Sequence, residues 1–288
     1  MGNGDGRAVV VTGASTGIGQ ACALHLDRKG FRVFAGVRKP ADGDALRAGA
    51  SDRFTTLFLD VTDPSSIAAA ADRVSSAVGP IGLAGLVNNA GVAVAAPLEF
   101  VPIDELRRSL EVNVVGQIAV TQAFLPLLRA GRGRIVNMGS ISGRIASALF
   151  GPYAASKFAL EALTDTLRRE LAPWGIEVVI VQPGNIATPI WHKTAAWSDE
   201  VRRILPRQAE ELYGASMDGA RRYAEKAPDV GLPAKQVALV VEHALTAPRP
   251  RTRYTIGRQA GIALFLIRSL PDRWLDRALR RVWVRRGT

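Results

Sequence analysis

The chain has 288 residues, of which 48% are hydrophobic and 22% charged, so it can form a well-packed globular core. Its one cysteine, Cys22, excludes an internal disulfide and a cysteine-based zinc site, and a reducing compartment fits that composition. The net charge of +11 is concentrated in residues 249–288, which contain 11 Arg, 2 Asp and neither Lys nor Glu. Because no linker-like composition occurs before about residue 190, we expect a single domain over 1–288.

The hydropathy pattern predicts neither a secretory leader nor a membrane span. The first apolar run, residues 8–11, is short for a signal peptide and leads directly into a glycine-rich turn. The longest late apolar run, residues 260–267, is much shorter than the roughly 20 residues that cross a bilayer. We therefore expect a cytoplasmic protein.

Short runs of β-branched residues alternate with helix-like stretches through the first two thirds of the chain. Several runs are almost wholly apolar, which is typical of strands buried on both faces of a parallel sheet. Helices are predicted at 63–78 and 103–128, and Asp63 followed by Pro64 favours the start of the first. The alternation predicts an α/β fold of Rossmann type: a doubly wound parallel sheet of about seven strands with helices on both faces. The strands identified are Ala8–Thr12, Phe31–Val37, Thr56–Leu59, Leu83–Asn88, Arg134–Met138 and Glu177–Val181.

A glycine-rich turn follows the first predicted strand, at the edge where doubly wound sheets bind ligands. Its sequence, Thr12-Gly13-Ala14-Ser15-Thr16-Gly17-Ile18-Gly19, has GxxxGxG spacing and leads into a helix. Glycines let the backbone turn sharply, and a helix N-terminus offers free N–H groups and a positive dipole end to a pyrophosphate. A tight turn without a ligand is the alternative. The residues predicted to bind a dinucleotide here are Gly13, Ser15, Thr16, Gly17, Ile18 and Gly19.

The end of the second strand indicates which dinucleotide is bound. Many NAD-binding folds place an acidic residue there to hold the ribose 2′-hydroxyl, whereas this chain has Val37 followed by Arg38. A guanidinium can bind a 2′-phosphate through charge-assisted hydrogen bonds, so NADP(H) is predicted in preference to NAD(H). A basic residue at position 16 would have strengthened this prediction, but the chain has Thr16 there. The alternative for Arg38 is that it stacks over the adenine or lies in solvent.

Asp60 and Val61 follow the third strand and are assigned to the same cofactor-binding set. The Asp60 carboxylate is a candidate acceptor for the adenine amino group. Alternatively, Asp60 acts only with Asp63 in capping the next helix.

Three polar side chains form a candidate catalytic group. Tyr153 and Lys157 are four residues apart on a predicted helix and share a face. Ser140 precedes Tyr153 by 13 residues and follows an apolar strand, which places it at the ligand-binding edge. A free tyrosine has a pKa of roughly 10, and a neighbouring ammonium lowers that pKa. Because a nearby hydroxyl can hold an oxygen on which charge develops, the group suits carbonyl reduction by hydride transfer.

Six segments of residues 7–190 occur in an order and spacing that resemble the short-chain dehydrogenase/reductase family: Thr12-Gly13-(x3)-Gly17-x-Gly19, Asn88-Asn89-Ala90-Gly91, Asn113, Ser140, Tyr153-(x3)-Lys157 and Pro183-Gly184-(x3)-Thr188. The resemblance implies that Tyr153 is the general acid and base and that Ser140 steadies the substrate oxygen. It implies that Lys157 lowers the Tyr153 pKa and binds the nicotinamide ribose. Asn113 would hold a water that links Lys157 to solvent; alternatively, it is a helix-bending residue satisfied by the backbone. Further cofactor contacts are implied for Asn88, Ala90, Gly91, Pro183, Gly184, Ile186 and Thr188.

The segment 189–230 is long and aromatic, and the resemblance implies that it folds over the substrate as a lid. Its Trp and Met residues suggest an apolar pocket, although aromatic residues of a lid serve packing as often as ligand contact. The pattern resembles the branch of the family that acts on steroids, retinoids and related alcohols. We therefore expect a small lipophilic alcohol or ketone as substrate. The residues in question are Trp191, Trp197, Tyr213 and Met217.

Two other functions are compatible with this fold. A non-catalytic NADP(H)-sensing protein would have no need of the Ser140, Tyr153 and Lys157 group. A nucleotide-sugar epimerase or dehydratase shares a Tyr/Lys pair, but the glycine spacing and the Asn-Asn-Ala-Gly segment disfavour it. By resemblance, the helices around 103–128 and 153–172 would pair subunits into a homodimer or homotetramer.

Residues 258–288 are predicted to form a basic amphipathic extension. Such a helix can lie on an anionic membrane as a peripheral contact. Alternatively, its apolar stripe packs on the body of the protein or on a second subunit. No nucleic-acid-binding module is recognisable, so we expect no nucleic-acid partner, and no metal is expected at the site. The stripe comprises Trp274, Leu275, Ala278, Leu279, Val282 and Trp283, and the other face carries Arg273, Arg277, Arg280 and Arg281.

Overall fold

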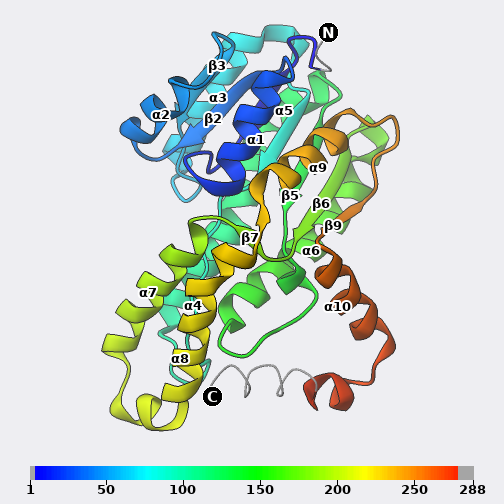
Figure 1. Cartoon of the computed structure of the whole chain (residues 1–288). Coiled ribbons are helices and arrows are strands. Elements are labelled where there is room, and N and C mark those ends of the chain that lie inside the picture. The colour runs from blue at the N-terminus through cyan, green and yellow to red at the C-terminus, as the bar shows by residue number, and fades with distance from the viewer. Residues whose placement is uncertain (1–3, 278–288) are drawn as a thin grey trace.

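The computed structural model describes residues 4–277 and places seven parallel strands in one central sheet (Figure 1). Their order across the sheet is β3-β2-β1-β4-β5-β6-β9, so the chain winds outward from β1 in both directions. The predicted doubly wound parallel sheet is confirmed. The strands are β1 (Ala8–Val11), β2 (Arg32–Val37), β3 (Phe54–Phe58), β4 (Gly85–Asn88), β5 (Arg134–Met138), β6 (Glu177–Pro183) and β9 (Arg253–Ile256).

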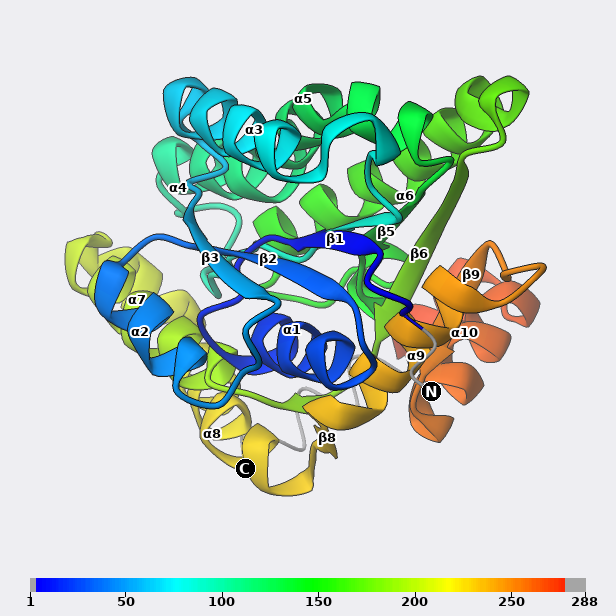
Figure 2. The ribbon, with the colours of Figure 1, turned by 90° about the horizontal axis from the view of Figure 1, so that it is seen from above.

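Helices cover both faces of the sheet (Figure 2). One layer contains α1 (Gly17–Arg28), α2 (Pro40–Arg47) and α9 (Ala234–Thr246). The other contains α3 (Pro64–Val78), α5 (Gly116–Ala130) and α6 (Gly151–Leu171). Helix α3 begins as predicted, because the Asp63 carboxylate accepts a hydrogen bond from the Ser65 N–H at 2.9 Å.

Side chains of β1 alternate between the two layers. Val9 and Val11 pack among residues of α1 and α9, whereas Ala8 and Val10 pack among residues of α3 and α5. Cys22 is fully buried in the first of these clusters, and burial raises the pKa of its thiol to about 12. The cysteine therefore serves as a small apolar core residue.

The helix predicted over 103–128 is interrupted. It runs as α4 (Ile103–Leu110), a π-helical turn (Glu111–Val115) and α5. By length and composition the whole segment, Ile103–Ala130, could cross a membrane. Val120, Phe124 and Leu128 of this segment pack in the core among residues of α3 and β4, whereas Ile103 and Val115 are exposed.

Two further helices, α7 (Ile190–Ile204) and α8 (Arg207–Val230), pack on each other beyond the carboxyl ends of the strands, in the lower half of Figure 1. The Arg202 guanidinium joins them, since it hydrogen-bonds to both Glu210 and Asp218. The segment between the sheet and α7 pairs with the segment after α8 through two short strands, β7 (Ile186–Ala187) and β8 (Leu232–Pro233). We call this unit the α7–α8 pair.

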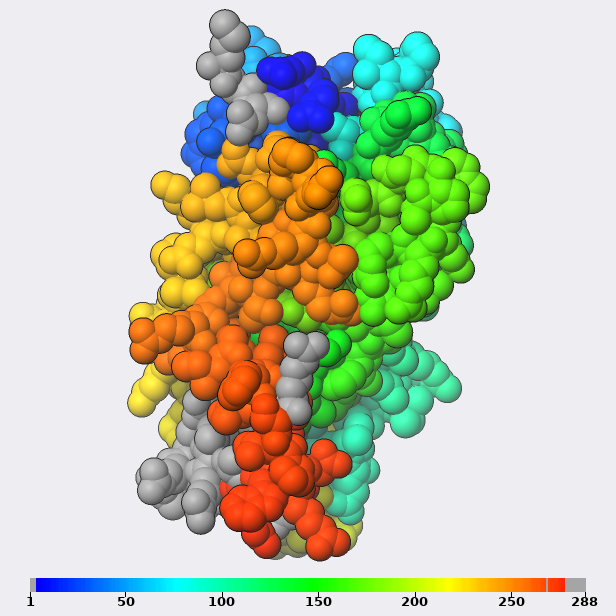
Figure 3. All heavy atoms as spheres, turned by 90° about the vertical axis from the view of Figure 1, so that its right-hand side faces the viewer, coloured from blue at the N-terminus to red at the C-terminus, as the bar shows by residue number. Residues whose placement is uncertain are grey.

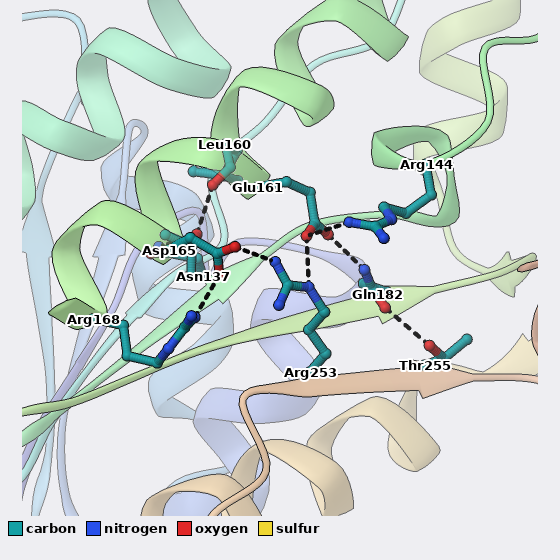
Figure 4. Close-up of polar contacts among 10 residues, drawn as sticks. Asn137, Arg144, Leu160, Glu161, Asp165, Arg168, Gln182, Arg253 and Thr255 are labelled. Carbon is teal, nitrogen blue, oxygen red and sulfur yellow. Dashed lines mark hydrogen bonds and ion pairs between the residues drawn. The ribbon is translucent and has the colours of Figure 1, made fainter. Parts of the chain in front are cut away.

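Strand β9 was not identified in the sequence, because Arg253 and Thr255 interrupt its apolar pattern. Its polar side chains are satisfied by α6 and β6 (Figure 4). The Arg253 guanidinium contacts Glu161 at 3.0 Å and Asp165 at 2.8 Å, and the Thr255 hydroxyl donates to Gln182 at 2.9 Å. Long-range pairing thus places a polar strand at the edge of the sheet.

The chain continues from β9 into α10 (Arg258–Ser269), which lies on the surface in the half of the molecule away from the N-terminus (Figure 3). Ile262, Phe265 and Leu266 are exposed on it, and Trp274 further on is 62% exposed. Most of the predicted amphipathic stripe, from Ala278 onward, lies outside the described residues.

Candidate active site

A cavity of about 740 Å³ opens at the carboxyl ends of the central strands, between the glycine loop and the α7–α8 pair. Ligands of doubly wound sheets bind at this edge, and the volume suits a small-molecule ligand. Most residues predicted from the sequence meet here. Those that line it are Gly13, Ser15, Thr16, Gly17, Ile18, Arg38, Asp60, Val61, Ala90, Gly91, Ser140, Tyr153, Lys157, Pro183, Gly184, Ile186 and Thr188.

The glycine loop needs its glycines for backbone geometry and for close approach. Gly13 and Gly17 have φ values of +61° and +62°, a region that disfavours other residues. A Cβ at Gly13 would lie 2.8 Å from the Cα of Ala90. Gly19 does not line the cavity; a Cβ there would clash with the Gly13 carbonyl oxygen, so this glycine permits tight packing inside the loop.

Thr12 and Asn89 fasten the glycine loop to the end of β4. The Thr12 hydroxyl oxygen accepts from the N–H groups of Asn89 and Ala90, at 2.9 and 3.0 Å. The Asn89 side-chain amide donates to the carbonyl oxygens of Thr12 and Gly13 at 3.0 and 3.1 Å. Asn89 lines the cavity, whereas the sequence motif predicted that Asn88 would contact the cofactor.

Asn88 does not line the cavity, although it was assigned to the cofactor-binding set. Its side chain is buried behind the sheet edge and donates to Thr121 at 2.8 Å and to Asn137 at 3.0 Å. Alternation along a strand explains the difference, because successive side chains of β4 point to opposite faces.

Arg38 and Asp60 lie at the ends of β2 and β3, on one wall of the cavity. The Asp60 carboxylate accepts from the N–H and hydroxyl of Thr62, at 3.0 and 2.8 Å. It stabilises the turn before α3 while still facing the cavity. Capping of α3 is done by Asp63, so the alternative role proposed for Asp60 in capping belongs to that residue.

Tyr153, Ser140 and Lys157 converge where β5 meets α6. The Lys157 ammonium donates to the Met138 carbonyl oxygen at 2.8 Å and lies 5.7 Å from the centre of the Tyr153 ring. Ser140 follows β5 and presents its hydroxyl to the cavity. The three residues predicted from i, i+4 spacing and strand position are thus brought together.

The ionisation of this group differs from the expectation. Burial raises the pKa of Tyr153 above its ordinary value, and a hydrogen bond with Ser140 only partly opposes that effect. The expected lowering of the Tyr153 pKa by Lys157 is not found in the free protein. Burial also lowers the pKa of Lys157 to about 8, since the charged ammonium loses hydration.

Asn113 lies in the π-helical turn and is fully buried. Its side-chain amide donates to the Val92 carbonyl and to the Ser156 hydroxyl, both at 2.9 Å, and its side-chain oxygen accepts from the Val92 N–H at 2.8 Å. Both side-chain donors are therefore used within the protein. A water at Asn113 would therefore bind to its main chain or to the second lone pair of its side-chain oxygen, and a π-helical turn is a common place for such irregular bonding.

Of the aromatic and Met residues singled out in the α7–α8 pair, only Trp191 lines the cavity. Its indole N–H donates to the Ile186 carbonyl at 2.9 Å, and its ring meets Tyr223 edge to face at 5.4 Å. Trp197 stacks with Arg108, Tyr213 donates to Glu99, and Met217 is buried between the helices. These three serve packing, the alternative considered for them.

Several residues that line the cavity carry no signal in the sequence. Tyr223, Lys193 and Arg108 come from helices outside the family motifs, and Phe150 precedes α6. No local pattern marks them, because each is brought to the cavity only by the packing of α4, α7 and α8.

The sequence matches known proteins over most of its length. The family model described as short chain dehydrogenase matches residues 7–199. "Retinol dehydrogenase 5" of Mus musculus is 41% identical over 284 residues, which is 96% of this chain and 88% of that protein. "17-beta-hydroxysteroid dehydrogenase type 6" of Bos taurus is 40% identical over 96% of this chain and 89% of that protein. "NADPH-dependent 3-dehydrocapnine reductase" of Ornithobacterium rhinotracheale is 36% identical, over 94% and 95% respectively.

Solved structures resemble the fold over nearly the whole chain. A short chain dehydrogenase from Burkholderia cenocepacia, solved in complex with NADP, has a TM-score of 0.73 at 27% identity, covering 97% of this chain and 99% of that one. A short-chain dehydrogenase from Streptomyces avermitilis has a TM-score of 0.74 at 28% identity, with 94% and 97% covered.

Proposed function

This chain belongs to the short-chain dehydrogenase family, and it is an oxidoreductase that acts on CH–OH groups with NAD(P). On that basis, we propose that it uses NADP(H) to reduce or oxidise a lipophilic ketone or alcohol. The observation that carries the proposal is the convergence of Ser140, Tyr153 and Lys157 in one cavity whose far wall carries Arg38. A sensing protein would not need the first three residues. An epimerase acting on nucleotide-linked sugars is disfavoured by the spacing of the glycine loop and by the Asn-Asn-Ala-Gly segment.

The cavity fits a dinucleotide. Gly13 and Gly17 remove side chains from the loop before α1, and the α1 N-terminus presents its free N–H groups there. We assign Ser15, Thr16 and Ile18 to the pyrophosphate and its adjoining ribose. Asp60 and Val61 are assigned to the adenine, and Ala90, Gly91 and the segment from Pro183 to Thr188 to the nicotinamide half. The bound cofactor would supply or accept the hydride.

The proton chemistry belongs to the protein. In the reducing direction, the hydroxyls of Ser140 and Tyr153 hold the substrate carbonyl oxygen. Tyr153 gives its proton to that oxygen as the hydride reaches the carbon, so the product is the neutral alcohol. The raised pKa of Tyr153 keeps the hydroxyl protonated before the reaction. Lys157, held by the Met138 carbonyl, then stabilises the phenolate and returns a proton to it.

Arg38 is the residue on which the preference for NADP(H) depends. Fluorescence titration with NADPH and with NADH tests it directly. We expect tighter binding of NADPH, and an Arg38→Ala variant should lose about tenfold in NADPH affinity with NADH affinity unchanged, because one charge-assisted hydrogen-bonding group is removed. Equal binding of the two cofactors by the natural protein would contradict the preference, while binding of neither would contradict the proposed function.

The lipophilic substrate is supported by the lining of the cavity beyond the catalytic group. Phe150, Ile190, Trp191 and Tyr223 are among the residues that line the cavity, and apolar walls bind apolar substrates by removing their surface from water. We assign the α7–α8 pair the role of the lid. A panel of ketones matched in carbonyl type but differing in ring size tests the idea, with kcat/KM rising with apolar area. Faster turnover of small polar ketones would exclude it.

We infer that subunits associate through the helices of the second layer. Val115 and Phe158 are large apolar residues that are 51% and 44% exposed on neighbouring elements of that layer. Association would bury this area. Light scattering after gel filtration should show a dimer or tetramer, and Phe158→Glu should weaken it; a monomeric natural protein would refute the assignment.

The C-terminal extension is assigned to peripheral contact with an anionic membrane. Ile262, Phe265 and Trp274 are exposed, so these side chains do not pack on the body of the protein, and arginines flank them. Full-length protein should sediment with anionic vesicles at low salt, and a chain truncated after Gly257 should not. Vesicle binding that survives truncation would refute this role for the extension. No sedimentation, combined with dissociation of subunits on truncation, would assign the extension to a subunit contact.

A further inference from the structure

The first turn of α7 places a lysine at the phosphate end of the cavity. The Lys193 ammonium donates to the Thr16 hydroxyl at 3.2 Å, and both residues line the cavity. Lys193 lies far from the glycine loop in sequence, and no family motif includes it. We propose that Lys193 binds the pyrophosphate of the dinucleotide cofactor from the side opposite the glycine loop, an inference that rests on the proposed function.

The position of Thr16 indicates which phosphate lies within reach. Thr16 is the N-cap of α1, and its side chain makes no capping hydrogen bond. Its hydroxyl therefore marks the helix N-terminus, where free N–H groups favour a pyrophosphate. Arg38, the group assigned to the 2′-phosphate, comes from a different element at the end of β2.

The residues just before α7 pack directly on the N-terminus of α1. A Cβ at Gly17 would lie 3.2 Å from the Thr188 Cβ and 3.7 Å from the Pro189 Cδ. The Lys193 N–H bonds to the Pro189 carbonyl at 3.1 Å, so the lysine begins one turn from that contact. Packing thus holds the main chain of Lys193 near the start of α1, and its exposed side chain reaches Thr16 from there.

A second contact holds α7 across the cavity. Trp197 lies one turn beyond Lys193, and the Arg108 guanidinium stacks over its ring, 4.0 Å from the ring centre. Arg108 belongs to α4 and also lines the cavity. Helix α7 therefore contacts the N-terminus of α1 through Lys193 and α4 through Trp197. The end of α7 that carries Lys193 faces the glycine loop.

The charge of Lys193 is poorly balanced in the free protein. Among residues 4–277 it has no carboxylate within ion-pair distance, and its hydrogen-bond partner is a neutral hydroxyl. The acidic residues that line the same cavity, Asp60 and Glu111, come from the β3 end and the π-helical turn. A pyrophosphate would replace a neutral acceptor with an anionic one, and such hydrogen bonds are roughly twice as strong.

Binding of two cofactors to three variants tests the proposal. NADPH and NADH share the pyrophosphate and differ in the 2′-phosphate. Lys193→Met, which keeps the length of the side chain, should weaken both by the same factor, about tenfold for one charged hydrogen bond from an exposed side chain. Lys193→Arg should retain most of the affinity. Lys226→Met, an exposed lysine of α8 outside the cavity, is the matched control and should bind both normally.

The outcomes separate this inference from the function on which it rests. If the natural protein binds neither cofactor, the proposed function fails. If it binds them and Lys193→Met binds equally well, the inference is overturned. A loss confined to NADPH would also overturn it, because the ammonium would then contact the 2′-phosphate. Thermal unfolding of the variants should match the natural protein, so that lost affinity is not a loss of fold.

Discussion

The Lys157 ammonium donates a hydrogen bond of 2.8 Å to the main-chain carbonyl oxygen of Met138. This bond joins α6 to the end of β5 at the point where the chain turns toward Ser140. It fixes the charge beside Tyr153 even before any ligand is present. A lysine on a helix face is thereby positioned by a strand that lies 19 residues earlier in the chain.

Replacement of Tyr153 by Phe removes the hydroxyl that we propose as the proton donor and little else. We expect turnover to fall by at least about 100-fold, as is usual when a general acid is lost. NADPH affinity should remain unchanged. Tyr213→Phe is the control, because that hydroxyl contacts Glu99 outside the cavity. Steady-state kinetics and fluorescence titration give the two readouts, and activity retained by Tyr153→Phe would refute the assigned role.

Lys157→Met should abolish activity and yet stabilise the free protein. Burial lowers the pKa of Lys157 to about 8, so the folded state carries the cost of a buried charge below that pH. The cost disappears as pH rises through the folded pKa toward the ordinary value of 10.5, where the unfolded chain also loses its proton.

The expected gain at pH 7 is about 1 kcal/mol, because loss of the bond to Met138 offsets part of the relief. Denaturation by urea at pH 7 and pH 10 measures it. The difference between variant and natural protein should shrink at the higher pH; a difference that grows with pH would rule out the buried charge of Lys157 as its cause.

Arg253→Met should destabilise the sheet edge. The Glu161 carboxylate is buried and relies on Arg253 at 3.0 Å and Gln182 at 2.6 Å, with Arg144 farther away at 3.8 Å. Removal of the guanidinium leaves this charge underpaired, which we expect to lower the free energy of unfolding by about 2 kcal/mol. Arg251→Met is the control, since Arg251 is exposed. Equal stability of the two variants would show that Glu161 does not depend on Arg253.

The contact between α1 and α9 should make stability depend on acidity. The Glu242 carboxylate lies 2.6 Å from the His25 ring and 3.2 Å from the Lys29 ammonium. Burial would raise the pKa of Glu242, but the hydrogen bonds from His25 and Lys29 outweigh it, and the pKa is lowered. The ionised carboxylate therefore stabilises the fold above its ordinary pKa of 4.5, and this contribution is lost as pH falls through the folded value.

Glu242→Gln should accordingly reduce the free energy of unfolding by about 1 kcal/mol at pH 7. The reduction should fade in acid, because below pH 4.5 the natural carboxyl takes up its proton more readily in the unfolded chain than in the folded one. Urea titrations at pH 7 and at pH 3.5 compare the two proteins. An unchanged gap at the lower pH would exclude ionisation of Glu242 as the source.

Much of the site could be read from local spacing. The distance of four residues between Tyr153 and Lys157 fixes a common helix face, and Gly13 with Gly17 marks the turn after β1. Strand β9 could not be found in this way, because Arg253 becomes compatible with a buried edge only when Glu161 and Asp165 lie beside it. Neither could the orientation of Asn88, since the sequence does not say which face of β4 turns toward the cavity.

The parallel α/β architecture and the glycine loop could be predicted from the sequence, because they follow from periodicity and backbone geometry over a few residues, and the family resemblance added the candidate catalytic group. The tertiary structure was needed to show which side chains of α7 and α8 reach the cavity and how burial affects the ionisation of the candidate catalytic group. Burial raises the pKa of Tyr153 and lowers that of Lys157. Loss of hydration depends on atoms brought together from distant parts of the chain, and no local pattern encodes it.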